Sequence, residues 1–194
     1  MRPFSSYNGA MRTLGLSATV LLLAGALAGQ QPAPAKGGHA MAKFTLASSA
    51  FASGAAIPDA YTCTGGDVSP ALAWSDAPTP IASFALIADD PDAPAGTWVH
   101  WLIWNIPPTM QALPKDMPKS GRLDNGALQG RNDFRKTGYN GPCPPPGKTH
   151  RYFFRMYALD AKLTLEPGAT RQQLDAAMKG HIVDEAEYMG TYRR

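Results

Sequence analysis

Apolar residues along the chain come in short runs separated by turn-forming residues, a pattern that predicts β-strands. The run Ser83–Ala88 is apolar after its serine and is typical of a buried strand. Further strands are predicted at Trp98–Ile106, from His150 onwards and at Ile182–Tyr192. Several strands with turns between them favour a mostly β fold, and we expect a β-sandwich of antiparallel sheets.

Shorter strands are predicted before these, at 43–47, 61–63 and 69–74. Residues 107–136 instead form a long polar connection with few apolar residues to anchor it. Connections of this length are usually functional or flexible. The pattern therefore places most of the regular structure on either side of this connection.

One helix is predicted, near Thr170–Lys179. Thr170 and Gln173 have the spacing of a capping box, in which each residue satisfies a backbone N–H of the other. Leu174 and Met178 then recur at helical spacing and form an apolar stripe. We expect this C-terminal helix to pack on the sandwich rather than to carry chemistry.

Three carboxylates, Asp89, Asp90 and Asp92, stand where the apolar strand Ser83–Ala88 ends. Pro91 and Pro94 follow closely, and a proline disfavours helical backbone in the residue before it. The carboxylates are therefore expected on a stiff, extended arm.

The next strand carries one ionisable residue, His100, near its start. Side chains alternate along a strand, so His100 is expected on the same face as Leu102 and Trp104, with Trp101 opposite. Spacing alone leaves two interpretations open. Asp90 and His100 belong to a functional site, or they are a turn cap and a hydrogen-bonded core histidine.

A second polar stretch lies at 140–160, where a Gly-Pro-rich loop leads into a strand that begins at His150. Prolines fix φ and remove backbone donors, so the loop is expected to be stiff. Along the strand, His150 and Tyr152 share one face and Arg151 faces the other way. A histidine and a tyrosine thus project together from the start of this strand.

These two stretches resemble the phosphatidylethanolamine-binding protein family, also called Raf kinase inhibitor-like proteins, in its bacterial branch. The family's marks are a DPDAP arm followed by His-Trp, and a Gly-Pro loop followed by His-Arg-Tyr. This chain has both, at 90–94 with His100-Trp101 and at 141–142 with 150–152. The resemblance covers about residues 43–194. One departure is Arg135, where the family usually has glycine after Phe134.

The resemblance implies a β-sandwich domain over 43–194 with a shallow anion pocket and no established catalytic cycle. It implies a small phosphorylated or zwitterionic ligand, without a cofactor or a metal. Imidazole, phenol and backbone N–H groups can donate to a phosphate, and carboxylates can orient an imidazole or accept an ammonium. The ligand-binding residues that we expect are Asp90, Asp92, His100, Gly141, Pro142, His150 and Tyr152.

Two other functions fit the same residue types. Two histidines and two aspartates are suitable zinc ligands, but the chain has no H-E-x-x-H pattern, and it has no G-x-S-x-G for a serine nucleophile. The alternative to ligand binding is a protein-interaction module that inhibits a protease or a kinase. Such a module is expected to act through an exposed loop within 107–136.

Residues 1–28 have the pattern of a secretory signal peptide. Arg12 precedes an apolar run that ends in the small residues Ala26-Leu27-Ala28, a cleavage signal. An uncleaved anchor is disfavoured because the run is shorter than the roughly 20 residues that span a membrane. Met11 is an alternative start. Residues 29–42, rich in Gly, Gln, Pro and Ala, are expected to be a disordered linker.

Cleavage would remove two arginines and no acidic residue, and so lower the net charge from +3 to +1. A nearly neutral domain gives no electrostatic reason to bind nucleic acid. We therefore expect a periplasmic or secreted protein without a membrane anchor after cleavage.

Cys63 and Cys143 are the chain's two cysteines. An even pair in an oxidising compartment is consistent with a disulfide, and two free buried thiols are the alternative. A bond would close a loop of roughly 80 residues, a constraint worth about 4–5 kcal/mol in the chain-entropy description. It would also hold the Gly-Pro loop against the turn after Cys63.

Overall fold

The computed structural model describes residues 43–194. The predicted signal peptide, 1–28, and the predicted linker, 29–42, lie outside the described residues. Over 43–194, no helix has the length and apolar character needed to cross a bilayer.

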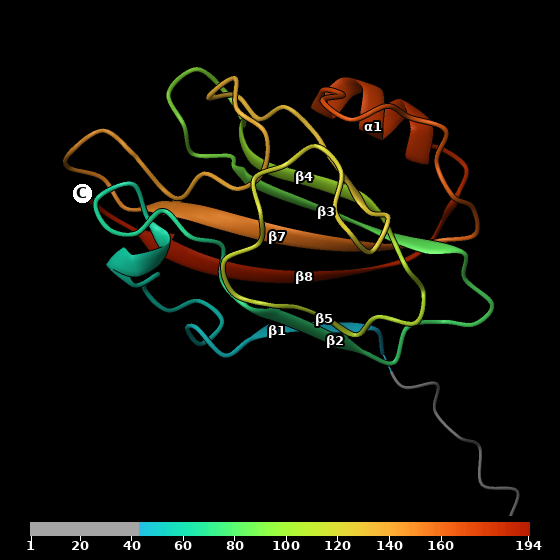
Figure 1. Ribbon diagram of the computed structural model, residues 1–194. Helices are drawn as coiled ribbons and strands as arrows, with labels where there is room; N and C mark the ends of the chain where they lie inside the picture. Colours follow the sequence, from blue (N-terminus) through green and yellow to red (C-terminus); the bar gives the residue numbers. More distant parts are fainter. Residues whose placement is uncertain (1–42) are drawn as a thin grey trace, which may run out of the picture. The chain divides into compact units, whose positions relative to one another are not determined.

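Two antiparallel sheets make up the fold (Figure 1). The larger sheet has the strand order β6-β4-β3-β7-β8, with bounds Leu128–Gln129, Trp98–Ile106, Ser83–Asp90, His150–Leu159 and Ile182–Tyr192. The smaller sheet has the order β1-β2-β5, with bounds Thr45–Ser48, Leu72–Ser75 and Ala112–Leu113. The four long strands therefore begin and end close to the positions that the apolar pattern predicts.

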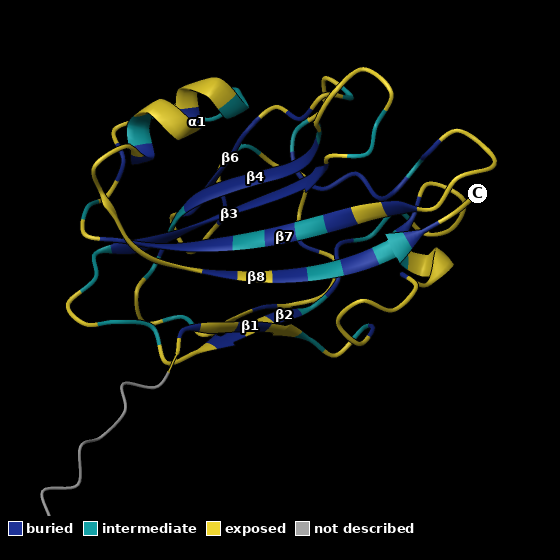
Figure 2. Cartoon of the chain, turned by 180° about the vertical axis from the view of Figure 1, so that it is seen from behind, coloured by how far each residue is buried: buried dark blue, intermediate teal, exposed yellow. Residues whose placement is uncertain are grey.

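The centre of the larger sheet is buried on both faces, and Figure 2 shows β3 and β4 buried along almost their whole length. Phe84 and Leu86 of β3 face the smaller sheet and pack in a core with Leu46 of β1 and Trp74 of β2. Alternate residues of the same strand, such as Ile87, pack in a second core on the opposite face. The fold is thus a mostly β sandwich, which confirms the expected fold class.

Helix α1, Arg171–Met178, covers that second face. The capping box is present: the Thr170 side chain accepts from the Gln173 backbone, and the Gln173 side chain accepts from the Thr170 backbone. Leu174 and Met178 are buried, while the outer face of the helix is exposed (Figure 2). The predicted helix and its packing role are confirmed.

The prediction of a strand at 61–63 is wrong. A short 3-10 helix occupies Asp59–Tyr61, and Thr62 closes it by donating from both its backbone N–H and its hydroxyl to the Asp59 carbonyl. A threonine that bonds its own local backbone competes with strand pairing.

The connection 107–136 is more firmly anchored than its polar sequence indicates. It contains β5 and β6, and Leu123 is buried in the core between the sheets. Buried Gln129 donates to the carbonyls of Pro118 and Ser120 and accepts from the Trp101 indole. A single polar side chain thus ties this segment to β4.

A β-bulge at His100 changes which side chains share a face. Asp89 pairs with Val99 and Ala88 pairs with Trp101, so His100 is an extra residue between two paired positions. Leu102 packs on the helix side as expected, but His100 contacts Tyr152, which belongs to the core between the sheets. The expected grouping of His100 with Leu102 is therefore wrong, because a bulge breaks strict alternation.

Candidate functional site

Neighbouring strands bring Asp90 and His150 together at one end of the larger sheet. Asp90 is the last residue of β3 and His150 is the first residue of β7, and the two strands pair antiparallel. His150 Nδ1 lies 2.8 Å from Asp90 Oδ2, and both side chains are almost fully buried. The Asp90 carboxylate therefore holds the His150 ring in one orientation.

His100 reaches the same region from β4. Its Nδ1 donates to the Asn140 carbonyl at 2.6 Å, and its ring lies between the rings of Phe134 and Tyr152, with centroids 5.3 and 5.2 Å away. Burial lowers the pKa of His100 below its usual 6.5, against the opposite effect of the Asn140 carbonyl. The neutral imidazole is thus the favoured form in the folded protein.

The hydrogen bonds also determine what the two imidazoles offer. A carbonyl or carboxylate oxygen only accepts, so Nδ1 carries the proton in both rings. The remaining ring nitrogen, Nε2, bonds no other side chain among the described residues in either His100 or His150. Each Nε2 is therefore available to a ligand, as an acceptor in a neutral ring and as a donor in a protonated one.

The Tyr152 hydroxyl is buried and has no hydrogen-bond partner within residues 43–194. Burial, reinforced by the nearby Asp90 charge, raises the pKa of Tyr152 well above its usual value. The group is therefore a neutral phenol at every physiological pH. An unpaired buried hydroxyl costs stability, so this O–H is a donor that a bound acceptor would satisfy.

Asp92 already has a protein partner. Arg151 donates to its carboxylate from Nε at 2.8 Å and from Nη2 at 2.7 Å, and its backbone N–H adds a third bond. These bonds, led by the one from the Arg151 side chain, lower the pKa of Asp92 to about 2. Asp92 Oδ2 and Oδ1 therefore act as acceptors for Arg151 and hold the arm against the start of β7.

Asp89 does not join the site. Its carboxylate accepts from Arg155 at 2.7 Å and from Arg171, the first residue of α1, at 2.8 Å. Both bonds lie on the helix side of the sheet, because adjacent residues of a strand point to opposite faces. The three expected carboxylates thus share no partner: Asp89 binds two arginines, while Asp90 pairs with His150 and Asp92 with Arg151.

The Gly-Pro loop is held in place by its own backbone. The Gly141 N–H donates to Asp67 Oδ1 at 2.6 Å, and the Pro142 carbonyl accepts from the Cys63 N–H at 3.1 Å. A Cβ on Gly141 would lie 2.2 Å from the Tyr61 carbonyl oxygen, so only glycine fits here. Gly141 and Pro142 therefore position the loop, and its later residues reach the pocket.

Cys63 and Cys143 form the disulfide that the sequence left open. The bond fastens the Gly-Pro loop to the segment after the 3-10 helix, where the Cys63–Pro142 hydrogen bond also lies. Two independent links thus hold the loop beside the strand ends.

These elements enclose a pocket of about 200 Å³. Of the expected site residues, Asp90, His100 and His150 line it, while Tyr152 contacts the His100 ring. The other lining residues are Ala93, Pro94, Trp98, Phe134, Cys143, Pro144 and Pro145. The walls are therefore apolar and stiff, and the polar groups converge on one side.

Several residues that shape this pocket were not singled out from the sequence. Asp67 orients the loop, accepting from Gly141, from Asn140 and from Lys119. Trp98 and Phe134 pack edge to face, with centroids 5.5 Å apart, and form an aromatic wall. Asp67 follows Gly65-Gly66 in the sequence and has a positive φ of 50°. The Gly-Gly pair was the one sequence signal that could have pointed to a turn at Asp67.

The described residues contain no group of three His, Cys, Asp or Glu side chains placed to hold a metal ion. Asp90 is bonded to His150 and Asp92 to Arg151.

The chain is similar to known proteins in sequence and in fold. The family model described as phosphatidylethanolamine-binding protein matches residues 47–193. A UPF0098 protein of Methanothermobacter thermautotrophicus is 51% identical over 149 residues, covering 77% of this chain and 98% of that protein. A UPF0098 protein of Pyrococcus horikoshii is 47% identical over 150 residues, covering 76% of this chain and 75% of that protein.

Two crystal structures are similar in fold and sequence. One is a homologue of phosphatidylethanolamine-binding protein from Chlamydia trachomatis, with a TM-score of 0.72 and 41% identity, covering 78% of this chain and 98% of that one. The other is YbcL of E. coli, described as a new member of the mammalian phosphatidylethanolamine-binding protein family. It has a TM-score of 0.72 and 35% identity, covering 79% of this chain and 99% of that one.

Proposed function

The chain belongs to the phosphatidylethanolamine-binding protein family, and from this premise we propose that it binds a small phosphorylated ligand resembling a phospholipid headgroup. The observation that carries the proposal is the unpaired, buried Tyr152 hydroxyl beside two imidazoles whose Nε2 atoms bond no other side chain among the described residues. The two imidazoles line a small pocket and the Tyr152 ring lies against one of them, so up to three donors lie in or beside the pocket.

A phosphoryl group suits these donors. The Tyr152 hydroxyl is a neutral phenol and can donate its proton to a phosphate oxygen. Each imidazole donates from Nε2 once that nitrogen is protonated. The Asp90 carboxylate accepts from His150 Nδ1, which leaves Nε2 of that ring for the ligand.

A zwitterionic ligand also needs a place for its ammonium group. Asp90 already accepts from His150 and Asp92 from Arg151, so they are poor candidates for that role. Trp98 and Phe134 form the aromatic wall of the same pocket. An ammonium group is attracted to the face of an aromatic ring, and this wall is the proposed contact for ethanolamine.

We propose binding rather than catalysis. The Asp90–His150 pair has the form of an acid–base dyad, but the pocket lacks a nucleophile for it to activate. The lining has no serine or threonine, and its one cysteine, Cys143, has its sulfur in the disulfide. The same disulfide supports the proposal that the protein works in an oxidising compartment, the periplasm or the medium.

The test is a thermal-shift titration with phosphorylethanolamine, with and without chelator. A ligand that binds only the folded state adds about 2.7 kcal/mol of stability at a hundredfold excess over Kd. We expect a saturable rise in Tm that survives chelator and is lost in His150→Ala. His181→Ala is the matched control, because His181 is exposed and pairs with Asp160 instead.

Absence of a rise at millimolar phosphorylethanolamine would overturn the proposal for this headgroup and favour the protein-interaction alternative. A rise that persists in His150→Ala would place the ligand elsewhere. A rise that chelator removes would require a metal in the site.

A further inference from the structure

A second pocket lies at the other end of the sandwich, where β3 begins. Its lining comes from the end of β2, the turn into β3 and the residues after β4, and it encloses about 180 Å³. Phe84 lies six residues before Asp90 along β3, which is about 20 Å at 3.3 Å a residue. The two pockets are therefore separate sites at opposite ends of the same strand.

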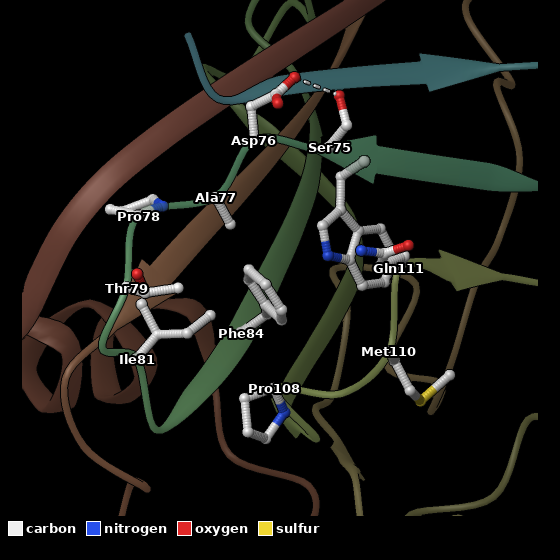
Figure 3. Close-up of a pocket in the computed structure, with 11 residues that line it drawn as sticks. Ser75, Asp76, Ala77, Pro78, Thr79, Ile81, Phe84, Pro108, Met110 and Gln111 are labelled. Atoms are coloured by element: carbon white, nitrogen blue, oxygen red, sulfur yellow. Dashed lines mark hydrogen bonds between the residues drawn. The ribbon is translucent and has the colours of Figure 1, made fainter. Parts of the chain in front are cut away.

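The interior of this second pocket is mostly apolar (Figure 3). Phe84 stands in its middle, with Ile81 on one side and Pro108 and Met110 on the others. Trp74 also lines it and packs edge to face on Phe84, with centroids 5.2 Å apart. An aromatic pair of this kind forms a rigid surface for a flat ring.

One polar atom in this apolar setting lacks a partner. Trp74 Nε1 is buried and makes no hydrogen bond within the described residues. An indole nitrogen only donates, and an unpaired buried donor carries the full desolvation penalty of that group. By contrast, Trp101 Nε1 donates to Gln129 at 2.6 Å. Trp74 lines the pocket, so an acceptor that enters beside its ring, with a small movement of the lining, would satisfy Nε1 and recover this lost bond.

The rim selects against anions. Asp76 lines the pocket, is exposed, and accepts from the Ser75 hydroxyl at 2.8 Å. No arginine, lysine or histidine lines the pocket to offset that carboxylate. The acceptor that reaches Trp74 should therefore be neutral, such as a carbonyl oxygen, and not a phosphate or a carboxylate.

We propose that this pocket binds a neutral, ring-sized apolar molecule that carries a carbonyl, with the carbonyl accepting from Trp74 Nε1. The volume agrees with this class of ligand, since cavities of about 150 Å³ in protein cores hold a single benzene ring. The chemistry is opposite to that of the first pocket, where donors and imidazoles favour an anion. One domain thus carries two sites for two kinds of small molecule.

The test is a titration with benzamide, followed by the indole N–H signals in two-dimensional ¹H–¹⁵N NMR spectra. The chain has four tryptophans, and Trp74→Phe assigns the Trp74 signal while keeping an aromatic ring at the site. We expect the Trp74 proton signal to move downfield saturably and the Trp101 signal to stay in place. Ethylbenzene, which has the ring but no acceptor, should give no downfield shift.

Affinity gives the second readout. We expect Trp74→Phe to weaken benzamide binding roughly threefold to tenfold, the size of one neutral hydrogen bond. Ala77→Leu, which adds bulk to the lining while keeping Trp74, should weaken it further, and His150→Ala should leave it unchanged. An unmoved Trp74 signal at 20 mM benzamide, or equal affinity in Trp74→Phe, would overturn the proposal.

Discussion

His150 Nδ1 and Asp90 Oδ2 lie 2.8 Å apart, with 6% and 4% of the two side chains exposed. The bond joins the first residue of β7 to the last residue of β3, so the ends of two central strands depend on it. Asp90 also accepts from the Asp92 N–H at 2.8 Å and thereby fixes the start of the arm. The same carboxylate thus contributes to both the pocket and the fold.

Asp90→Ala should lower the free energy of unfolding by about 3 kcal/mol, because it leaves a buried imidazole and a backbone N–H without their acceptor. Asp92→Ala should cost less than about 1 kcal/mol, since Arg151, its partner, is 54% exposed. Urea unfolding of the two variants measures the difference. Equal losses would contradict the distinction between a buried and an exposed pair.

Tyr152→Phe should change stability and binding in opposite directions. The variant removes a buried hydroxyl that has no described partner, so stability should rise or stay within about 1 kcal/mol. The affinity for phosphorylethanolamine should fall about tenfold, because the ligand loses one donor. Calorimetric titration and urea unfolding measure the two effects. If affinity is unchanged, the hydroxyl does not contact the ligand.

His100 should make the fold sensitive to mild acid. Burial lowers its pKa below 6.5 in the folded state, so the unfolded chain binds a proton that the folded protein excludes. The neutral ring makes its full contribution to the free energy of unfolding above pH 6.5. This contribution is lost as the pH falls below 6.5, at up to about 1.4 kcal/mol per pH unit.

Urea unfolding at pH 7.5, 6.5 and 5.5 measures this slope. His100→Gln removes the titrating group and should flatten it, whereas His181→Ala changes an exposed histidine and should not. The same slope in His100→Gln as in the unchanged protein would assign the acid sensitivity to other groups.

The pattern of apolar residues predicted the long strands well. Each of these strands packs on one or both faces, and the residues that pack are the apolar ones. The helix was predicted from Thr170 and Gln173, whose capping box is a purely local interaction. The prediction of a short strand at 61–63 was wrong, because Thr62 bonds the Asp59 carbonyl, and local spacing does not distinguish such a turn from an edge strand.

The site shows where sequence patterns reach their limit. His150 and Tyr152 were correctly placed on one face of a regular strand, as their common buried pattern shows. His100 was placed on the wrong face because its position depends on a bulge, which depends in turn on pairing with β3. The separate partners of Asp89, Asp90 and Asp92 likewise cannot be assigned without knowing which strand lies beside which.

The disulfide should matter more to the pocket than to the rest of the sandwich. It closes a loop with a sequence separation of 80 residues, so Cys63→Ser/Cys143→Ser should lose about 4–5 kcal/mol in the chain-entropy description. Cys143, Pro144 and Pro145 also form one wall of the pocket. Loss of the bond should therefore weaken phosphorylethanolamine binding beyond what partial unfolding explains.

Calorimetric titration at a temperature where the double variant is still folded separates the two effects, with urea unfolding as the measure of stability. Reduction of the unchanged protein should reproduce the variant, whereas the benzamide response of the pocket at Trp74 should survive, because no lining residue there lies on the Gly-Pro loop. If the folded double variant binds phosphorylethanolamine as tightly as the oxidised protein, the Cys63–Pro142 hydrogen bond and Asp67 hold the loop without the sulfur link.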